Sequence, residues 1–96
     1  MPNDKQLTAI FDALAMPISR QFMELVAMQP RTDRELQKFF DLSLPQIQHT
    51  GDVLAALGLV TRANPEHYDY HPEGLARVRE WIARIESIRH PNSQPR

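Results

Sequence analysis

The chain has 96 residues, 42% of them hydrophobic, and a formal net charge of −1. This length fits one small domain, at a size where pairing with a second copy often adds buried surface. The absence of cysteine excludes disulfides, thiolate metal sites and cysteine nucleophiles. No apolar run approaches the roughly 20 residues that a membrane span needs, so we expect a cytoplasmic protein with no membrane partner. Because the charge is near neutral, any DNA binding must come from local geometry.

Two amphipathic helices are predicted before Pro30. The first has apolar residues at helical spacing, namely Leu7, Ile10, Phe11 and Leu14. It ends near Ala15, because Met16-Pro17 breaks the pattern. Pro17 suits the first position of a second helix, which Gln29-Pro30 closes. We expect this second helix to lie at the centre of the core.

Two capping signals predict a helix-turn-helix in the middle of the chain. Thr32-Asp33-Arg34-Glu35 has the spacing of a capping box, in which a hydroxyl and a carboxylate satisfy each other's free backbone N–H groups at a helix start. Ser43-Leu44-Pro45-Gln46 repeats the signal with a glutamine and adds a proline in the first turn. Only about three residues separate the two predicted helices, which is typical of a helix-turn-helix.

The apolar pattern of these two helices predicts which side faces the core. The residues expected to be buried are Leu36, Phe39, Phe40, Ile47, Leu54 and Leu57. Gly51 lies between the last three, where only a small residue would allow close packing. Gly58 is expected to end the second helix in a left-handed conformation.

The remainder of the chain predicts a hairpin and a last helix. Residues 59–62 and 67–70 have β character, and Asn64-Pro65-Glu66 between them reads as a turn. Pro72-Glu73 opens the last helix, and His90-Pro91 ends it. We therefore expect a mainly α fold with a small β-hairpin, in a single domain over residues 1–91, followed by a flexible tail over residues 92–96.

The last helix carries a long apolar stripe. Leu75, Val78, Ile82 and Ile85 repeat at the 3-4-3 spacing of paired helices. The stripe either covers its own domain or pairs with the first or last helix of a second subunit. We favour the second alternative, with an interface formed by Leu7, Ile10, Leu14, Leu75, Val78, Ile82 and Ile85.

Several segments, taken in order, resemble one family of regulators. They are Ala13-Leu14-Ala15-Met16-Pro17 with Arg20, Glu35-Leu36, Ser43-Leu44-Pro45-Gln46-Ile47, Leu54 to Leu57 with Gly58-Leu59-Val60, and His71-Pro72-Glu73-Gly74-Leu75. From about residue 7 to residue 88 the chain resembles the ArsR family of bacterial winged-helix repressors. The resemblance implies a winged helix-turn-helix with five helices and a two-stranded wing. It also implies a homodimer joined through its first and last helices, bound to double-stranded DNA as a transcriptional regulator.

The candidate DNA-contacting residues lie in the second helix of the helix-turn-helix and in the wing. They are Ser43, Gln46, Gln48, His49, Thr50 and Arg62. Amide side chains can pair with an adenine edge, and threonine can touch a thymine methyl. Each of these residues except Ser43 also has a structural alternative. Gln46 completes the capping box, Gln48 and His49 are solvated, and Thr50 packs beside Gly51. Arg62 pairs with Asp69 or Glu66 across the hairpin.

The charge of this region favours a second hypothesis. Between Arg31 and His71 there are four arginines and lysines against six acidic residues. Asp52 lies where a lysine is common in the family, and it adds like charge near phosphates. The alternative function is therefore a winged-helix module for protein interaction or dimerisation that has lost DNA binding.

Metal and catalytic sites find little support in the sequence. The family's metal-ligand positions fall at residues that do not bind metals, namely Thr32, Arg34, Pro72, Gly74, Ile85 and Ile88. His67, Asp69 and His71 could form a three-ligand site, although surface histidines are the commoner reading. No catalytic motif is present, so we expect neither an enzyme nor a cofactor. An unidentified small-molecule effector would fit between the first and last helices.

Overall fold

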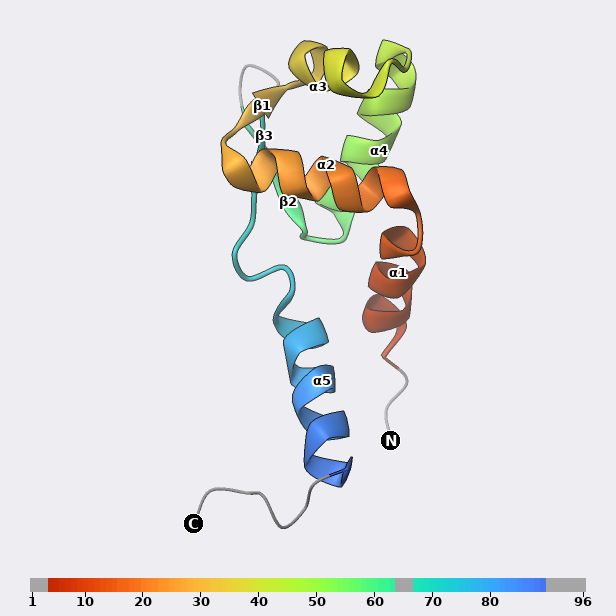
Figure 1. Ribbon diagram of the computed structural model, residues 1–96, viewed down its shortest axis with the longest axis vertical. Coiled ribbons are helices and arrows are strands. Elements are labelled where there is room, and N and C mark those ends of the chain that lie inside the picture. The colour runs from red at the N-terminus through yellow and green to blue at the C-terminus, as the bar shows by residue number, and fades with distance from the viewer. Residues whose placement is uncertain (1–3, 64–66, 90–96) are drawn as a thin grey trace.

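The structure is a computed structural model that describes residues 4–63 and 67–89, shown in Figure 1. The helices are α1 (Lys5–Leu14), α2 (Pro17–Met28), α3 (Asp33–Phe40), α4 (Leu44–Ala56) and α5 (Ala76–Arg89). The strands are β1 (Arg31–Thr32), β2 (Val60–Ala63) and β3 (His67–Tyr70). The winged helix-turn-helix with five helices is thus confirmed. The expected turn at 64–66, the helix end at His90-Pro91 and the tail over 92–96 lie outside the described residues.

Both predicted capping boxes form. Thr32 Oγ1 accepts from the Glu35 N–H at 3.1 Å, while Glu35 Oε1 accepts from the Thr32 N–H at 2.8 Å. Ser43 and Gln46 repeat this exchange at the start of α4. Between the helices, Asp41 takes a left-handed conformation with φ 53°. This reversal, which aspartate tolerates, turns the chain from α3 into α4.

The predicted two-stranded wing forms, and a short strand that was not predicted pairs with it. The sheet is antiparallel in the order β1-β3-β2, so β3 is its central strand. The hairpin of β2 and β3 is as expected, but Arg31 and Thr32 also pair with Tyr68 and His67. The predicted two-stranded wing is therefore confirmed, and the short strand β1 extends it to a three-stranded sheet, which fixes the start of α3 to the wing.

Tyr68 and Phe22 occupy the centre of the core. Both are fully buried, and their ring centroids lie 5.2 Å apart in an edge-to-face arrangement. A Cβ on Gly51 would overlap the Tyr68 ring, so the predicted need for a small residue here is confirmed. Gly58 has φ +76°, as expected for a left-handed stop. Phe39, expected in the core, is instead 57% exposed, and the Arg31 guanidinium lies over its ring.

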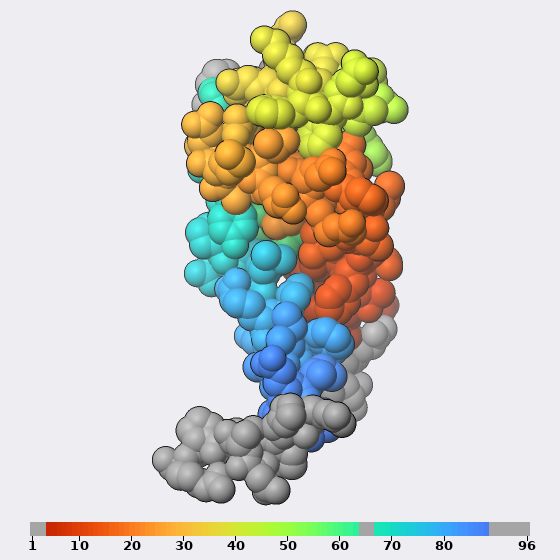
Figure 2. All heavy atoms as spheres, in the orientation of Figure 1, coloured from red at the N-terminus to blue at the C-terminus, as the bar shows by residue number. Residues whose placement is uncertain are grey.

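The last helix begins later than predicted. Residues 72–75 form turns, with i→i+3 hydrogen bonds from Gly74 N to His71 O and from Ala76 N to Glu73 O, and α5 begins at Ala76. Gly74 packs against the Gly58 carbonyl so closely that a Cβ would overlap it. From there α5 extends away from the body of the domain, beside α1, which gives the molecule its elongated shape (Figures 1 and 2). None of the described helices is long and apolar enough to cross a membrane.

Candidate nucleic-acid interface

The outward face of α4 carries most of the residues that we predict to contact DNA. Ile47, Gly51 and Leu54 are buried, so the opposite side of the helix faces solvent. The exposed residues there are Pro45, Gln46, His49, Asp52, Val53 and Ala56. At about 100° per residue, His49 lies at the centre of this face, and Gln48 and Thr50 lie to either side of it. We call these six exposed residues the reading face.

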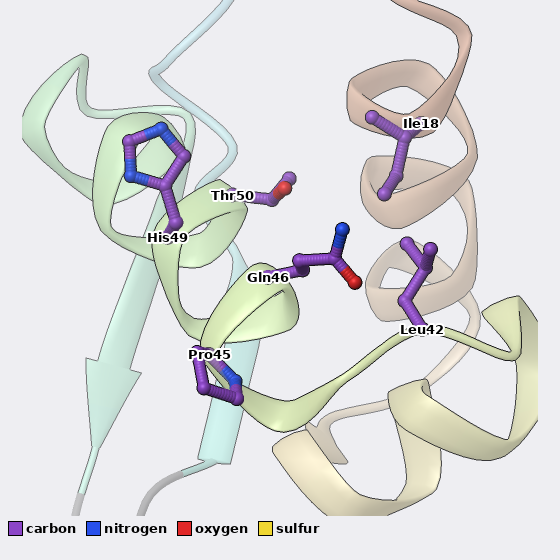
Figure 3. Close-up of a pocket in the computed structure, with 6 residues that line it drawn as sticks. All are labelled: Ile18, Leu42, Pro45, Gln46, His49 and Thr50. Carbon is purple, nitrogen blue, oxygen red and sulfur yellow. The ribbon is translucent and has the colours of Figure 1, made fainter.

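Gln46 takes part in both the cap and the reading face. Its Oε1 accepts from the Ser43 N–H and from the Ser43 hydroxyl, each at 3.0 Å. Figure 3 shows its side chain directed toward Ile18 and Leu42, while His49 extends to the other side of the helix. These residues line an open pocket of about 470 Å³ beside the N-terminal half of α4. The Gln46 amide nitrogen therefore remains at the exposed surface while the oxygen caps the helix.

Gln48 is held by the scaffold. Its Nε2 donates to Asp33 Oδ2 at 3.1 Å, and Asp33 is only 4% exposed. This bond ties α4 to the first turn of α3. Thr50, on the other flank, is half-buried and lines the pocket beside Ile18. The structure thus brings Ser43, Gln46 and His49 together on the exposed side, and leaves Gln48 and Thr50 at its margins.

The wing arginine contacts the reading face directly. Arg62 Nη1 lies 2.5 Å from Asp52 Oδ1, in an ion pair between β2 and α4. The expected partner Asp69 instead accepts from the Tyr70 N–H, and Glu66 lies outside the described residues. Spacing along α4 places Asp52 on the same face as His49, but it does not indicate that Arg62 of β2 lies beside it.

Burial makes one positive charge on this side of the molecule inaccessible to a phosphate. Arg31 is 8% exposed, donates from Nε to the Leu25 carbonyl at 3.0 Å, and lies over the Phe39 ring. Arg34 and Lys38 of α3 remain exposed. Because Arg62 is paired with Asp52, the exposed positive charges of the described helix-turn-helix that remain for a phosphate backbone are those of Arg34 and Lys38 on α3.

The predicted dimer residues divide into two groups. Leu7 and Ile10 are buried within the protomer, and Leu14, Leu75 and Val78 are half-buried against its own core. Ile82 and Ile85 are exposed. Three further apolar residues are also exposed, although the predicted dimer interface did not include them, namely Phe11, Trp81 and Ile88. The predicted stripe is therefore half-buried at Leu75 and Val78 and exposed from Ile82 onward, where it forms an apolar surface on α5.

Two contacts fix α5 beside α1. The rings of Phe11 and Trp81 pack edge to face with centroids 5.2 Å apart. Arg77 Nη1 lies 3.3 Å from Asp4 Oδ2, at the N-cap of α1. Near this junction a pocket of about 200 Å³ is lined by residues that include Gln6, His71 and Arg77. These contacts give the exposed surface of α5 a defined position relative to the rest of the domain.

A metal site does not assemble among the described residues. Within 4–63 and 67–89, no group of three or more histidine, aspartate or glutamate side chains comes close enough to hold an ion. The three-ligand site considered for His67, Asp69 and His71 is therefore not formed in this structure.

Known structures with the same architecture include regulators of one family. No protein-family model and no curated protein matches the chain. A crystal structure of an ArsR family transcriptional regulator is 28% identical, covers 88% of this chain and 96% of its own, and superimposes with a TM-score of 0.80. The resemblance to the ArsR family is confirmed. The chain has the fold of these regulators over almost its whole described length.

Two more distant structures share this fold. One is the solution structure of a homodimeric winged helix-turn-helix DNA-binding domain from Mycobacterium bovis, described as a possible ArsR-family regulator. It is 19% identical, covers 91% of this chain and 89% of its own, and has a TM-score of 0.65. An ArsR-like transcriptional regulator from Rhodococcus is 20% identical, covers 95% of both chains and has a TM-score of 0.62. At these identities the likeness concerns the fold.

Proposed function

We propose that this chain is a DNA-binding transcriptional regulator that acts as a homodimeric repressor on an inverted-repeat operator. The observation that carries the proposal is the exposed reading face of α4 with the wing beside it, on a fold shared with a 28% identical ArsR family regulator. In such folds a helix of this kind enters the major groove and contacts base edges. Gln46 and His49 are the central contacts, and Ser43 holds Gln46 at the start of the helix.

The exposed apolar surface of α5 supports the homodimer. Ile82, Ile85 and Ile88 are 43%, 45% and 75% exposed, on a helix that extends away from its own core. A second copy related by two-fold symmetry would cover these side chains and present two reading faces to one side of DNA. A small-molecule effector that binds where α1 meets α5 would then act by changing the angle between the two reading faces.

Selection from genomic DNA tests this function. Purified protein is incubated with sheared genomic DNA at low and at moderate salt, and the retained fragments are sequenced. The proposal expects enrichment of a short inverted repeat with half-sites about one helical turn apart. A folded dimer that enriches nothing at low salt would overturn the DNA-binding function.

One observation favours the alternative of a protein-interaction module. The C-terminal half of the reading face contains only Asp52, Val53 and Ala56, without a lysine or arginine. Such a surface suits a polypeptide partner better than a phosphate backbone. The selection experiment separates the two functions, because an interaction module would retain no DNA sequence preferentially.

A further inference from the structure

An ion pair between Asp52 and Arg62 joins α4 to the wing, and the sequence did not predict this contact. Their side chains form an ion pair at 2.5 Å and remain partly open to solvent, at 59% and 36% exposure. The Arg62 guanidinium carbon also lies 5.3 Å from the centre of the Tyr68 ring, which is fully buried. The ring and the carboxylate together hold the Arg62 guanidinium beside α4.

This arrangement neutralises the wing's positive charge before DNA arrives. Among the described strand residues of the hairpin, Arg62 is the one lysine or arginine, and Asp52 is the one acidic residue in α4. A cation that neutralises a phosphate releases counterions, but a cation held by a carboxylate does not. If Arg62 leaves for a phosphate, Asp52 stands unpaired near other phosphates and repels them. Arg62 therefore has two competing partners, the Asp52 carboxylate and a DNA phosphate. Arg62 can move to the phosphate at low cost only if Asp52 finds another hydrogen-bond donor.

Base edges in the major groove carry donor groups that can replace Arg62 as the hydrogen-bond partner of Asp52. The N4 amino group of cytosine donates to aspartate and glutamate side chains. Asp52 lies one turn after His49 on the same exposed face, so a helix that brings His49 to a base edge also brings Asp52 to the groove. An exposed ion pair is weak enough to exchange partners.

We propose that Asp52 is a specificity-determining residue. On random DNA Asp52 stays paired with Arg62. Where a cytosine amino group donates to Asp52 instead, Arg62 is released and binds a phosphate. The inference rests on the proposed DNA-binding function and adds its mode of discrimination. On a matching site the protein gains both a base contact and a phosphate contact. On other sequences it gains neither, because Arg62 stays paired with Asp52.

The test compares wild type, D52A, R62A and the double variant on two duplexes. One duplex carries the sequence enriched from genomic DNA, and the other is a random sequence of equal length. Binding is measured at several salt concentrations. For D52A we expect affinity for random DNA to rise on the order of threefold to tenfold, and the salt slope to steepen by about 0.9, as for one added phosphate contact. Affinity for the enriched duplex rises less or falls, so the ratio between the two drops.

The arginine variants test the competition. R62A leaves the Asp52 carboxylate unpaired, so we expect weaker binding to both duplexes than in wild type. Adding D52A to R62A removes that carboxylate and should restore part of the lost affinity. Additive effects of the two substitutions would mean that the residues act independently, and would overturn the proposal.

A matched control separates this mechanism from a simple change of net charge. Glu24→Ala removes one exposed carboxylate from α2 and should leave the affinity ratio unchanged. An equal gain on random DNA from this variant would overturn the inference. If wild type prefers the enriched duplex and D52A has the same ratio of affinities for the two duplexes, the inference about Asp52 is overturned while the DNA-binding function stands. Wild-type protein that binds neither duplex would overturn the proposed function together with it.

A repeated selection with D52A provides a second readout. The wild-type motif is expected to contain a C·G pair in each half-site that loses its preference in the D52A motif, while the remaining positions persist. A motif identical to that of wild type would show that Asp52 reads no base.

Discussion

Gln48 donates an amide hydrogen bond to the buried carboxylate of Asp33, and so belongs to the scaffold that supports the reading face. Replacing Gln48 with alanine leaves a buried carboxylate oxygen without this donor. We expect the free energy of unfolding to fall by about 1–2 kcal/mol, as is usual when a buried group loses its partner. Chemical denaturation measures the change. Gln21→Ala, an exposed glutamine on α2, is the control and should change stability little. Equal stabilities for the two variants would contradict the structural role of Gln48.

The cap and the reading role of Gln46 can be separated by choice of substitution. Gln46→Glu keeps an oxygen for the Ser43 N–H and completes a standard capping box, so helix stability should be retained. The same change removes the amide donor and adds a negative charge that phosphates repel, so DNA affinity should fall at least tenfold, about 1.4 kcal/mol. Gln46→Ala should lose both. Thermal melting and DNA titration distinguish the three proteins, and a Q46E variant that binds DNA as wild type does would exclude Gln46 as a contact.

Gly51 and Gly58 should respond differently to alanine. A Cβ at Gly51 meets the ring of Tyr68 in the core, whereas nothing lies within 4 Å of a Cβ at Gly58. Overpacking costs about 1–3 kcal/mol or more, while the left-handed backbone of Gly58 costs a non-glycine residue about 1 kcal/mol. We expect Gly51→Ala to be the more destabilising change in urea titration. The reverse order would mean that α4 does not pack against β3 as described.

Features of the fold that depend on residues close together in the sequence were predicted, whereas contacts between distant segments were not. Both capping boxes formed because each involves residues three apart in the chain. The strand Arg31–Thr32 was missed, since two residues show no periodicity and their pairing depends on β3. The late start of α5 reflects the packing of Gly74 on Gly58, which Pro72 does not reveal.

The candidate site shows the same division. Helical spacing was enough to predict that Gln46 and His49 lie on the side of α4 opposite its buried residues. The hydrogen bond of Gln48 to Asp33 spans fifteen positions, and the pairing of Arg62 with Asp52 joins a strand to a helix. Phe39 was expected in the core because it lies three residues after Leu36, but it is 57% exposed and the Arg31 guanidinium lies over its ring. Such contacts follow from the packing of separate elements, which spacing in one element does not encode.

The exposed surface of α5 leads to a prediction about assembly. Ile82→Lys places a charge within the apolar surface, and because Ile82 is already exposed in the protomer, the domain should remain folded. We expect the variant to sediment as a monomer at concentrations where wild type forms a dimer. Glu80→Lys, a charge change at a neighbouring exposed position, is the control. A variant that retains the dimer would show that the subunits meet through another surface.

Acid should weaken the start of α3. The hydrogen bond from the Thr32 backbone N–H holds the pKa of Glu35 below its ordinary value. A carboxylate whose pKa is lowered on folding stabilises the protein above its unfolded pKa, and this stabilisation is lost as pH falls through the lowered pKa. The stability advantage of wild type over Glu35→Gln should therefore be full near neutral pH and shrink below about pH 4. Denaturation at a series of pH values measures the difference, and a gap independent of pH would contradict the assignment.

Contact of DNA with the reading face and the wing can be observed directly by nuclear magnetic resonance. Amide chemical shifts of isotope-labelled protein, followed during titration with an enriched duplex at low salt, report which residues respond. We predict that the largest changes occur at Gln46, His49 and Arg62, with smaller changes at Gln48. Changes confined to α5 or to the exposed side of α2, or no changes at all, would contradict DNA recognition by α4.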